Sequence, residues 1–251
     1  MKYDKIGVGY DGTRRVDPRI ADRILNLLAI RPDGRCVDVA CGTGNYTKYL
    51  SDAGLNIAGC DQSATMIEAA RAKAPMIAWH QADALSLPFE DGSFQGVVCT
   101  NAIHHFDDLE ASFSEINRIV SDGRLVLFTS TSEQMRGYWL NAYFPVAMEK
   151  SIAQMPTWET IQAALTAAGF RVVEYEPWYV PREPVDLFLY SGKHKPSLYL
   201  DPVVRRGIST FCDLADVAEV GSGIERLTTD IASGEIRQVI DRYNTLGCGL
   251  N

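Results

Sequence analysis

Short apolar runs alternate with amphipathic segments through most of the chain. Apolar runs bounded by Gly, Pro or polar positions are typical of buried strands. They predict strands over 36–40, 57–60, 76–80, 95–100, 124–129 and 171–175. Apolar positions spaced three and four apart predict helices over 18–29, 45–53, 63–72, 109–120 and 157–168. This alternation indicates an α/β fold, in which a parallel sheet is covered by helices on both faces.

Two segments are too long for simple connections in a minimal α/β domain. Residues 130–156 are rich in aromatic side chains, and residues 177–242 carry predicted helices over 185–190, 202–214 and 224–232. We expect 177–242 to form a helical cap over the carboxyl edge of the sheet, where open α/β sheets bind ligands. The expected organisation is 1–30 as an N-terminal lid segment and helix, 31–176 as the core containing the 130–156 insertion, 177–242 as the cap, and 243–251 as a final strand.

Composition narrows the class of protein. The 251 residues are 46% hydrophobic and 22% charged, an ordinary balance for a globular protein. A net charge of −8 disfavours nucleic acid as a partner, because phosphate binding needs a basic surface. The N-terminus lacks the apolar centre of a signal peptide, and no apolar run is long enough to cross a membrane. We therefore expect a cytoplasmic protein, monomeric or homodimeric, without a membrane partner.

The cysteines do not suggest a metal site. None of the six forms a CxxC pair, and four lie in or beside predicted strands. Small buried free thiols are the ordinary explanation of such a pattern, with zinc binding or disulfides as the alternatives. We expect no metal cofactor.

The strongest motif is VDVACGTGNYTKYL, over residues 37–50. An apolar strand runs into small residues and then into a helix, so a ligand can approach the backbone closely at free N–H groups. A dinucleotide-binding loop begins in the same way, but it would have Gly or Ala at position 47, where Thr47 stands. Asp38 inside the strand would repel a pyrophosphate. It would instead attract the amino group and sulfonium of S-adenosylmethionine, directly, through water or through the loop backbone.

Two further acids follow predicted strands. Asp61 ends the second strand, where a carboxylate can accept hydrogen bonds from both hydroxyls of a ribose. The alternative is that Asp61 or Ser63 only caps the next helix. Asp83 follows the third strand, where it can accept a hydrogen bond from an adenine amine while Ala84 and Leu85 contact the ring. The alternative for Asp83 is a loop-capping role.

In this order and spacing, the three signals resemble the class I methyltransferases of the ubiquinone/menaquinone-biosynthesis type, often called type 11. The resemblance covers roughly 3–128, and the loop motif matches at Asp38, Gly42 and Gly44. Ala40 replaces the first glycine of the motif, and Gln95 stands where relatives usually have Asp. The resemblance implies a Rossmann-like sheet of seven strands, mostly parallel with the last antiparallel, and S-adenosylmethionine lying across its carboxyl edge.

The resemblance also implies a lid. Related proteins carry a Tyr…Thr-Arg segment that folds over the cofactor, which corresponds to Tyr10, Thr13 and Arg14 here. The glycine loop offers N–H groups but no fixed positive charge, so Arg14 could pair with the donor carboxylate while Tyr10 approaches the sulfonium. The alternative is that Arg14 and Arg15 are a solvated pair at a helix start.

By resemblance, Asn101 and Ala102 lie beside the methionine portion of the donor. The candidate cofactor-binding residues are Tyr10, Arg14, Asp38, Ala40, Cys41, Gly42, Gly44, Asp61, Gln62, Met66, Asp83, Ala84, Leu85, Asn101 and Ala102.

The sequence gives weaker signals for the residues that bind the methyl acceptor or take its proton. His104 and His105 are the candidates for a general base, because neutral imidazole accepts a proton near pH 7. One of these rings could instead only anchor the turn after the fourth strand. The aromatic residues Tyr138, Trp139, Tyr143 and Trp178 could line an acceptor pocket or could pack the core of the cap.

These observations predict an S-adenosylmethionine-dependent methyltransferase that acts on an O, N or C nucleophile of a small molecule and yields S-adenosylhomocysteine. One alternative is a regulatory protein that binds S-adenosylmethionine without turnover. The other is a nucleotide-dependent oxidoreductase, which would need the glycine that Thr47 replaces.

Overall fold

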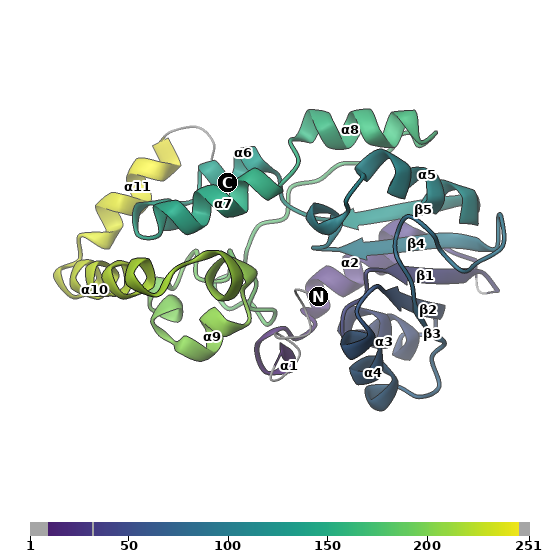
Figure 1. Cartoon of the computed structure of the whole chain (residues 1–251), viewed down its shortest axis with the longest axis horizontal. Coiled ribbons are helices and arrows are strands. Elements are labelled where there is room, and N and C mark those ends of the chain that lie inside the picture. The colour runs from purple at the N-terminus through teal and green to yellow at the C-terminus, as the bar shows by residue number, and fades with distance from the viewer. Residues whose placement is uncertain (1–9, 32, 246–251) are drawn as a thin grey trace. The chain divides into compact units, whose positions relative to one another are not determined.

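The structure is a computed structural model that describes residues 10–31 and 33–245 (Figure 1). The chain forms two compact units, each built from separate stretches of sequence. Of the described residues, unit 1 contains Tyr10, Asp11, Val16–Thr129 and Glu159–Val173. Unit 2 contains Gly12–Arg15, Ser130–Trp158 and residues 174–245. The aromatic-rich segment 130–156, predicted as an insertion in the core, and the segment 177–242, predicted as a cap, thus belong to one unit.

Unit 1 is built on a parallel sheet with the strand order β3-β2-β1-β4-β5. The strands are β1 (Arg35–Val39), β2 (Asn56–Asp61), β3 (Trp79–Gln81), β4 (Phe94–Thr100) and β5 (Val120–Phe128). β1 lies in the middle, where Asp38 pairs in register with Gly59 on β2 and Val98 on β4. Because all five strands are parallel, their carboxyl ends share one edge of the sheet.

Helices cover both faces of this sheet (Figure 1). Those of unit 1 are α2 (Pro18–Leu28), α3 (Asn45–Asp52), α4 (Ala64–Lys73), the short η2 (Ile103–His105), α5 (Leu109–Ile119) and α8 (Trp158–Ala167), whose first residue belongs to unit 2. α2 begins as its sequence predicts. Asp17 accepts a hydrogen bond from the backbone N–H of Arg19, and Pro18 takes the first helical position. Its apolar side, which includes Ile20 and Ile24, is buried.

The prediction of seven strands is wrong in number, because the described residues form five. Residues 171–175 do not pair as a strand, and Val173 and Tyr175 are 68% and 62% exposed. A run of strand-forming residues needs a neighbouring strand to pair with, and local propensity cannot supply one. The predicted final strand fails for another reason: Tyr243 lies in α11 (Ile236–Thr245), whose apolar residues repeat at helical spacing. Residues 246–251 lie outside the described part.

Unit 2 is helical. It contains α6 (Ser132–Arg136), η3 (Trp139–Ala142), α7 (Pro145–Gln154), η4 (Pro196–Leu200), α9 (Pro202–Arg206), the π-helical η5 (Thr210–Leu214), α10 (Val217–Ser233) and α11. The four-residue α1 (Tyr10–Thr13) begins in unit 1 and ends in unit 2. The predicted helix 202–214 is interrupted at Gly207, and 224–232 lies within the longer α10.

The predicted helix over 185–190 is wrong. Asp186 instead forms a β-bridge with Arg14, and the backbone N–H of Leu187 donates to the carbonyl of Thr13 at 2.9 Å. These partners are more than 170 positions away in the sequence. A local pattern cannot anticipate such contacts, which here override helix propensity.

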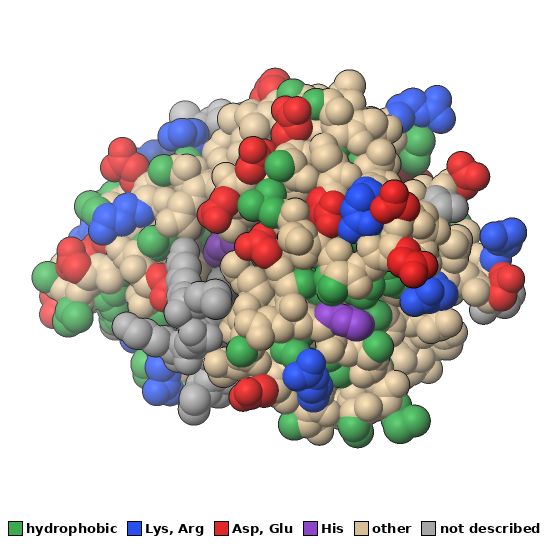
Figure 2. Space-filling model, turned by 45° about the vertical axis from the view of Figure 1, so that its right-hand side comes forward, with side chains coloured by type: hydrophobic (Ala, Val, Ile, Leu, Met, Phe, Trp, Pro, Cys, Tyr) green, Lys and Arg blue, Asp and Glu red, His purple; other side chains and the backbone are tan. Residues whose placement is uncertain are grey.

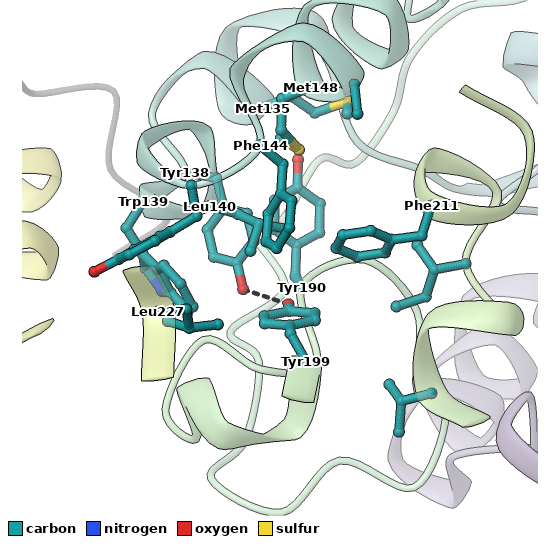
Figure 3. Close-up of a cluster of buried hydrophobic side chains, with 14 of the residues drawn as sticks. Met135, Tyr138, Trp139, Leu140, Phe144, Met148, Tyr190, Tyr199, Phe211 and Leu227 are labelled. Carbon is teal, nitrogen blue, oxygen red and sulfur yellow. Dashed lines mark hydrogen bonds between the residues drawn. The ribbon is translucent and has the colours of Figure 1, made fainter. Parts of the chain in front are cut away.

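The core of unit 2 is a cluster of aromatic and aliphatic side chains (Figure 3). The hydroxyls of Tyr138 and Tyr199 lie 2.6 Å apart at its centre, and Tyr138 packs edge-on against Tyr190. Tyr199 also donates to the carbonyl of Leu189 and accepts from the N–H of Gly192 at 3.1 Å. The cluster therefore joins apolar packing to a buried hydroxyl network, which fixes the relative positions of its rings.

Two surface properties bear on partners. On the face shown in Figure 2, acidic and basic side chains are interspersed. Among the described helices, none combines the length and the hydropathy that crossing a bilayer requires.

Candidate functional site

Four of the predicted cofactor-binding segments meet at the carboxyl edge of the sheet in unit 1. The glycine loop follows β1, Asp61 ends β2, Asp83 follows β3, and Asn101 follows β4. The strand order places these ends side by side. Ligands of open α/β sheets bind along this edge.

The glycine loop is held in left-handed backbone conformations. Ala40, Gly42 and Gly44 have φ angles of 59°, 56° and 73°. A Cβ atom on Gly44 would lie 2.2 Å from the ring of Trp79, so that glycine allows close packing. A Cβ atom on Gly42 would meet no atom within 4 Å, so the backbone there faces open space that a ligand can enter.

Asp61 connects two neighbouring segments of the site. Its Oδ2 accepts the backbone N–H of Gly42 at 2.9 Å, and its Oδ1 accepts that of Ser63 at 2.9 Å. Ser63 is the N-cap of α4, with its hydroxyl accepting the N–H of Met66. Burial raises the pKa of Asp61, and the two N–H bonds partly offset the rise. Each carboxylate oxygen still has a second lone pair for a ligand hydroxyl.

Asp38 lies buried beneath the loop, at 1% exposure. Its Oδ2 accepts the hydroxyl proton of Thr47 at 2.6 Å, so the two residues that separate this motif from a dinucleotide loop bind each other. Its Oδ1 has no hydrogen-bond partner within the described chain. Burial raises the pKa of Asp38 to about 7, with the nearby charge of Asp61 adding to the rise and the Thr47 bond opposing it. A cationic ligand group would stabilise the ionised form.

The turn after β3 contains the residues predicted to contact adenine. Asp83 Oδ1 accepts the backbone N–H of Leu85 at 2.9 Å, and the carbonyl of Asp83 accepts that of Ser86 at 3.0 Å. The turn leaves the side chain of Leu85 exposed, whereas Ala84 is half-buried. An apolar side chain therefore lies beside a hydrogen-bonding carboxylate, a combination that suits a base with an exocyclic amine.

Two of the predicted contacts lie differently. The side chain of Met66 is buried in α4, and its backbone N–H donates to the hydroxyl of Ser63. The side chain of Gln62 is exposed. The backbone carbonyl of Gln62 accepts a hydrogen bond from Gln81 Nε2 at 3.2 Å. Gln95, the departure from the family pattern, accepts the backbone N–H of Arg35 at 2.8 Å. That contact gives Gln95 a structural function at the start of β1.

Asn101 has two features that point to a ligand. Its φ is 52°, a left-handed value that Asn tolerates better than most residues. Its Nδ2 is buried and has no hydrogen-bond partner among the described residues. Burying an unpaired amide costs free energy, so this atom marks a place where a bound molecule would restore a bond. Ala102, the next residue, is buried.

His104 and His105 lie in η2, directly after Asn101 and Ala102. η2 places the ring centroids of His104 and His105 3.8 Å apart, at an interplanar angle of 48°. The backbone N–H of His105 donates to the carbonyl of Ala102 at 2.8 Å, which closes the turn. Both rings are half-buried. Two imidazoles thus follow the strand end that carries Asn101.

The N-terminal candidates are only partly described. Arg14 Nε donates to Asp186 Oδ1 at 2.6 Å within unit 2, and the carboxylate of Asp186 is almost fully buried. Arg14 is therefore not simply solvated. Pairing of Arg14 with a donor carboxylate stays a prediction. Tyr10 begins α1, but its side chain lies outside the described part.

Two charged residues at the glycine loop, Lys73 and Asp11, are not indicated by any sequence motif. Lys73, at the end of α4, donates to the carbonyl of Thr43 at 2.9 Å, so the loop does have a fixed positive charge. Asp11 pairs with Lys73 at 2.7 Å. No local signal identifies them, because both are distant from the loop in sequence.

The aromatic candidates for an acceptor pocket separate into two groups. Tyr138, Trp139 and Tyr143 are all at least 97% buried in the core of unit 2, where the hydroxyl of Tyr143 donates to Asp230 at 2.7 Å. Their burial supports a packing function for these three, and contact of any of them with the acceptor stays a prediction. Trp178 is half-buried.

The thiols and acids of the described residues do not assemble a metal site. Within the described chain, no three His, Cys, Asp or Glu side chains form a group that could hold a metal ion. Burial raises the pKa of the thiols of Cys41 and Cys99 well above the ordinary value, so both stay protonated. Cys41 also contributes its backbone, since its N–H donates to the carbonyl of Cys60 at 2.9 Å. Cys248 lies outside the described residues.

Comparison with known proteins decides the family. Residues 37–128 match the family described as "Methyltransferase domain". A demethylmenaquinone methyltransferase of Beutenbergia cavernae is 30% identical over 69% of this chain and 82% of its own length. A malonyl-[acyl-carrier protein] O-methyltransferase of Geobacter sulfurreducens is 31% identical over 80% of each chain. The chain belongs to the class I S-adenosylmethionine-dependent methyltransferases of type 11.

A solved structure extends the likeness over both units. A protein of Anabaena variabilis, described as a methyltransferase of an antibiotic biosynthesis pathway, is 37% identical. The match covers 90% of this chain and 91% of that one, with a TM-score of 0.82. The methyltransferase prediction and the α/β Rossmann-like fold class are confirmed, and the oxidoreductase alternative is wrong. This methyltransferase carries its family motif on the strands that form the site above.

Proposed function

We propose that this methyltransferase binds S-adenosylmethionine along the carboxyl edge of β1–β4 and transfers its methyl group to a small organic molecule. The observation that supports this most directly is Asp61. Its carboxylate holds the N–H of Gly42 at the point where the loop faces open space, and its remaining lone pairs can accept the two ribose hydroxyls.

Other residues at the edge fit the remaining parts of the donor. Asp83 and Leu85 would take the adenine, through the carboxylate and the exposed apolar side chain. Asp38 Oδ1 and Asn101 Nδ2, both buried without a partner in the described chain, would bind the charged amino and carboxylate groups of the methionine portion. When bound, the donor supplies an electrophilic methyl group on a sulfonium. The residues above hold it in one orientation.

We propose His104 and His105 as general bases, which remove a proton from the molecule that receives the methyl group. An O–H or N–H nucleophile must lose a proton as the methyl group is transferred, and neutral imidazole accepts one near pH 7. Alignment of the nucleophile with the methyl group contributes much of the acceleration, because it removes the entropic cost of encounter. Replacement of either histidine by Gln should therefore lower kcat while leaving donor affinity close to the native value.

The acceptor is proposed to be a small molecule. The two relatives named above act, by name, on demethylmenaquinone and on malonyl-acyl-carrier protein, so this family methylates chemically different acceptors. A net charge of −8 and interspersed surface charges give no support to a nucleic-acid acceptor.

The test has two stages. Calorimetry should show one S-adenosylhomocysteine bound per chain and no measurable binding of NAD. A metabolite extract incubated with labelled methyl donor should then yield a labelled small molecule, with the Asp61→Ala variant as the negative control. NAD binding of comparable affinity would contradict the donor assignment. Donor binding without any labelled product would favour the regulatory alternative.

A further inference from the structure

A polar cluster at the glycine loop is not part of the donor site proposed above. The carboxylate of Asp11 receives three side-chain donors. Thr43 Oγ1 and Asn45 Nδ2 donate to Asp11 Oδ1 at 2.6 and 2.9 Å. Lys73 Nζ lies 2.7 Å from Asp11 Oδ2. A hydroxyl, an amide and an ammonium group from three places in the sequence therefore converge on one side chain.

Lys73 also binds the loop directly. Its Nζ donates to the carbonyl of Thr43 at 2.9 Å and contacts Asn45 Oδ1. Thr43 lies between Gly42 and Gly44, and Asn45 is the first residue of α3. One ammonium group thus connects an acidic residue near the N-terminus, a loop carbonyl and the start of a helix.

The burial of the cluster distinguishes it from an ordinary surface ion pair. Thr43 is buried, the side chain of Lys73 is 22% exposed, and that of Asp11 is 45% exposed. Burial raises the pKa of Asp11, but the hydrogen bonds from Lys73, Thr43 and Asn45 outweigh it, so the net pKa lies below the ordinary value. The carboxylate is therefore charged, and its bonds are charge-assisted.

The flanking glycines explain why the loop needs such an anchor. Gly42 and Gly44 both have left-handed φ angles, and glycine loses more conformational freedom on ordering than any other residue. Between them, Thr43 has a side chain and a carbonyl that the Asp11–Lys73 pair can hold. Fixing this residue restricts the backbone N–H groups on either side of it.

We propose that Asp11 and Lys73 are positioning residues of the donor site, whose ion pair fixes Thr43 and Asn45 and so presents the backbone of the glycine loop to S-adenosylmethionine. This inference rests on the proposed function, since it assumes that the donor binds at the loop. A loop already ordered by its own side chains loses less entropy when a ligand binds, so the pair raises donor affinity. The pair is proposed to act on the glycine loop alone, so kcat at saturating donor should change little.

The experiment is a double-mutant cycle with Asp11→Asn, Lys73→Met and the combined variant, using S-adenosylhomocysteine as the calorimetric probe. Each single variant should weaken binding roughly three- to tenfold, as expected for loss of one partly buried charged contact. The combined variant should be no weaker than either single one, because both changes break the same unit. Lys73→Arg, which keeps the charge, should recover part of the affinity.

The direction of the Asp11 effect separates positioning from simple electrostatics. If the cluster acted only through its charges, removing the negative charge of Asp11 would help the donor carboxylate and Asp11→Asn would bind more tightly. The exposed pair Lys48 and Asp52 on α3 is the matched control, and Lys48→Met and Asp52→Asn should leave affinity unchanged. Thermal melts of each variant confirm that it is folded.

Failure of the inference is distinguishable from failure of the proposed function. If the native protein does not bind S-adenosylhomocysteine, the proposed function is wrong. If the native protein binds it, and folded Asp11→Asn and Lys73→Met bind it equally well or more tightly, the positioning function is wrong. Additive losses in the combined variant would also overturn it, because independent effects add.

Discussion

The carboxylate of Asp61, at the end of β2, accepts the backbone N–H of Gly42, in the loop after β1, at 2.9 Å. Two motifs that are separate in the sequence are therefore one structural unit. The acid that is proposed to bind the ribose also fixes the backbone on which the rest of the donor would lie. A change at Asp61 should consequently affect binding through both the lost ligand bonds and the loosened loop.

Asp61→Ala should weaken S-adenosylhomocysteine binding by about 100-fold, because hydrogen bonds to a charged group contribute about 1.5–3 kcal/mol each. Asp83→Ala should weaken it by only about tenfold, since one such bond is lost instead of two. Ser63→Ala removes the N-cap of α4 and should cost about 1 kcal/mol of stability with little loss of affinity. Calorimetry and denaturant melts on the three variants test this. Native affinity in Asp61→Ala would show that Asp61 serves only the protein backbone.

Ala40→Gly should stabilise the protein by about 1 kcal/mol. Ala40 has a φ of 59°, and the left-handed conformation costs a residue with a Cβ atom about 1–2 kcal/mol that glycine avoids. Urea denaturation measures the change. The control is Ala163→Gly on the exposed side of α8, where the same substitution should destabilise by about 1 kcal/mol. Equal destabilisation at both positions would contradict the strain at Ala40.

Asp38 should make folding stability fall as the pH rises. Its folded pKa of about 7 lies above the unfolded value, so in the intervening window the folded state binds more protons than the unfolded state. The free energy of unfolding then decreases by up to about 1.4 kcal/mol per pH unit from about pH 4 to about pH 7. Urea melts across this range should show the decrease in the native protein and a shallower one in Asp38→Asn.

The comparison with Asp38→Asn is needed because Asp61 also makes the free energy of unfolding decrease as the pH rises. Burial also raises the pKa of Asp61, and that contribution stays in the variant. The informative quantity is the difference in unfolding free energy between native protein and variant at each pH. A difference that is constant with pH would mean that Asp38 is ionised in the folded state.

Tyr199→Phe should destabilise the protein more than Tyr138→Phe. The hydroxyl of Tyr199 contacts Tyr138, Gly192 and Leu189, so its removal leaves several buried groups without a bond and should cost about 2–4 kcal/mol. Tyr138→Phe breaks the one shared bond and should cost about 1 kcal/mol. Tyr175→Phe, at an exposed position, is the control with no expected effect. Thermal melts of the three variants rank their stabilities. Equal stability of all three would contradict the hydroxyl network.

The core of unit 1 was predictable because its signals are local. Strand ends, the glycine loop and the acids after β2 and β3 occur in an order that family resemblance identifies. Asp38 and Thr47 were singled out as departures from a dinucleotide loop, and they prove to be hydrogen-bonded partners. The sequence thus located the five strands and the loops that form the candidate site, whereas it could not show that these two side chains meet.

Two of the misses share one physical cause, which is distant contact. The helix predicted over 185–190 is absent because Asp186 binds Arg14, and Lys73 was overlooked because its partners lie on other elements. The burial of the aromatic residues around Tyr138 likewise depends on packing partners from several elements of unit 2. Periodicity describes a segment alone, and none of these contacts belongs to a single segment.

The ion pair between Arg14 and Asp186 can form only late in translation of the chain. The two residues are 172 positions apart, so a ribosome adding about 5–20 residues per second needs roughly 10–35 s to make the second after the first. The five strands of the sheet, by contrast, are all translated once Phe128 has been added. Gly12–Arg15 therefore remain without their final partners in unit 2 while the sheet of unit 1 can already begin to fold.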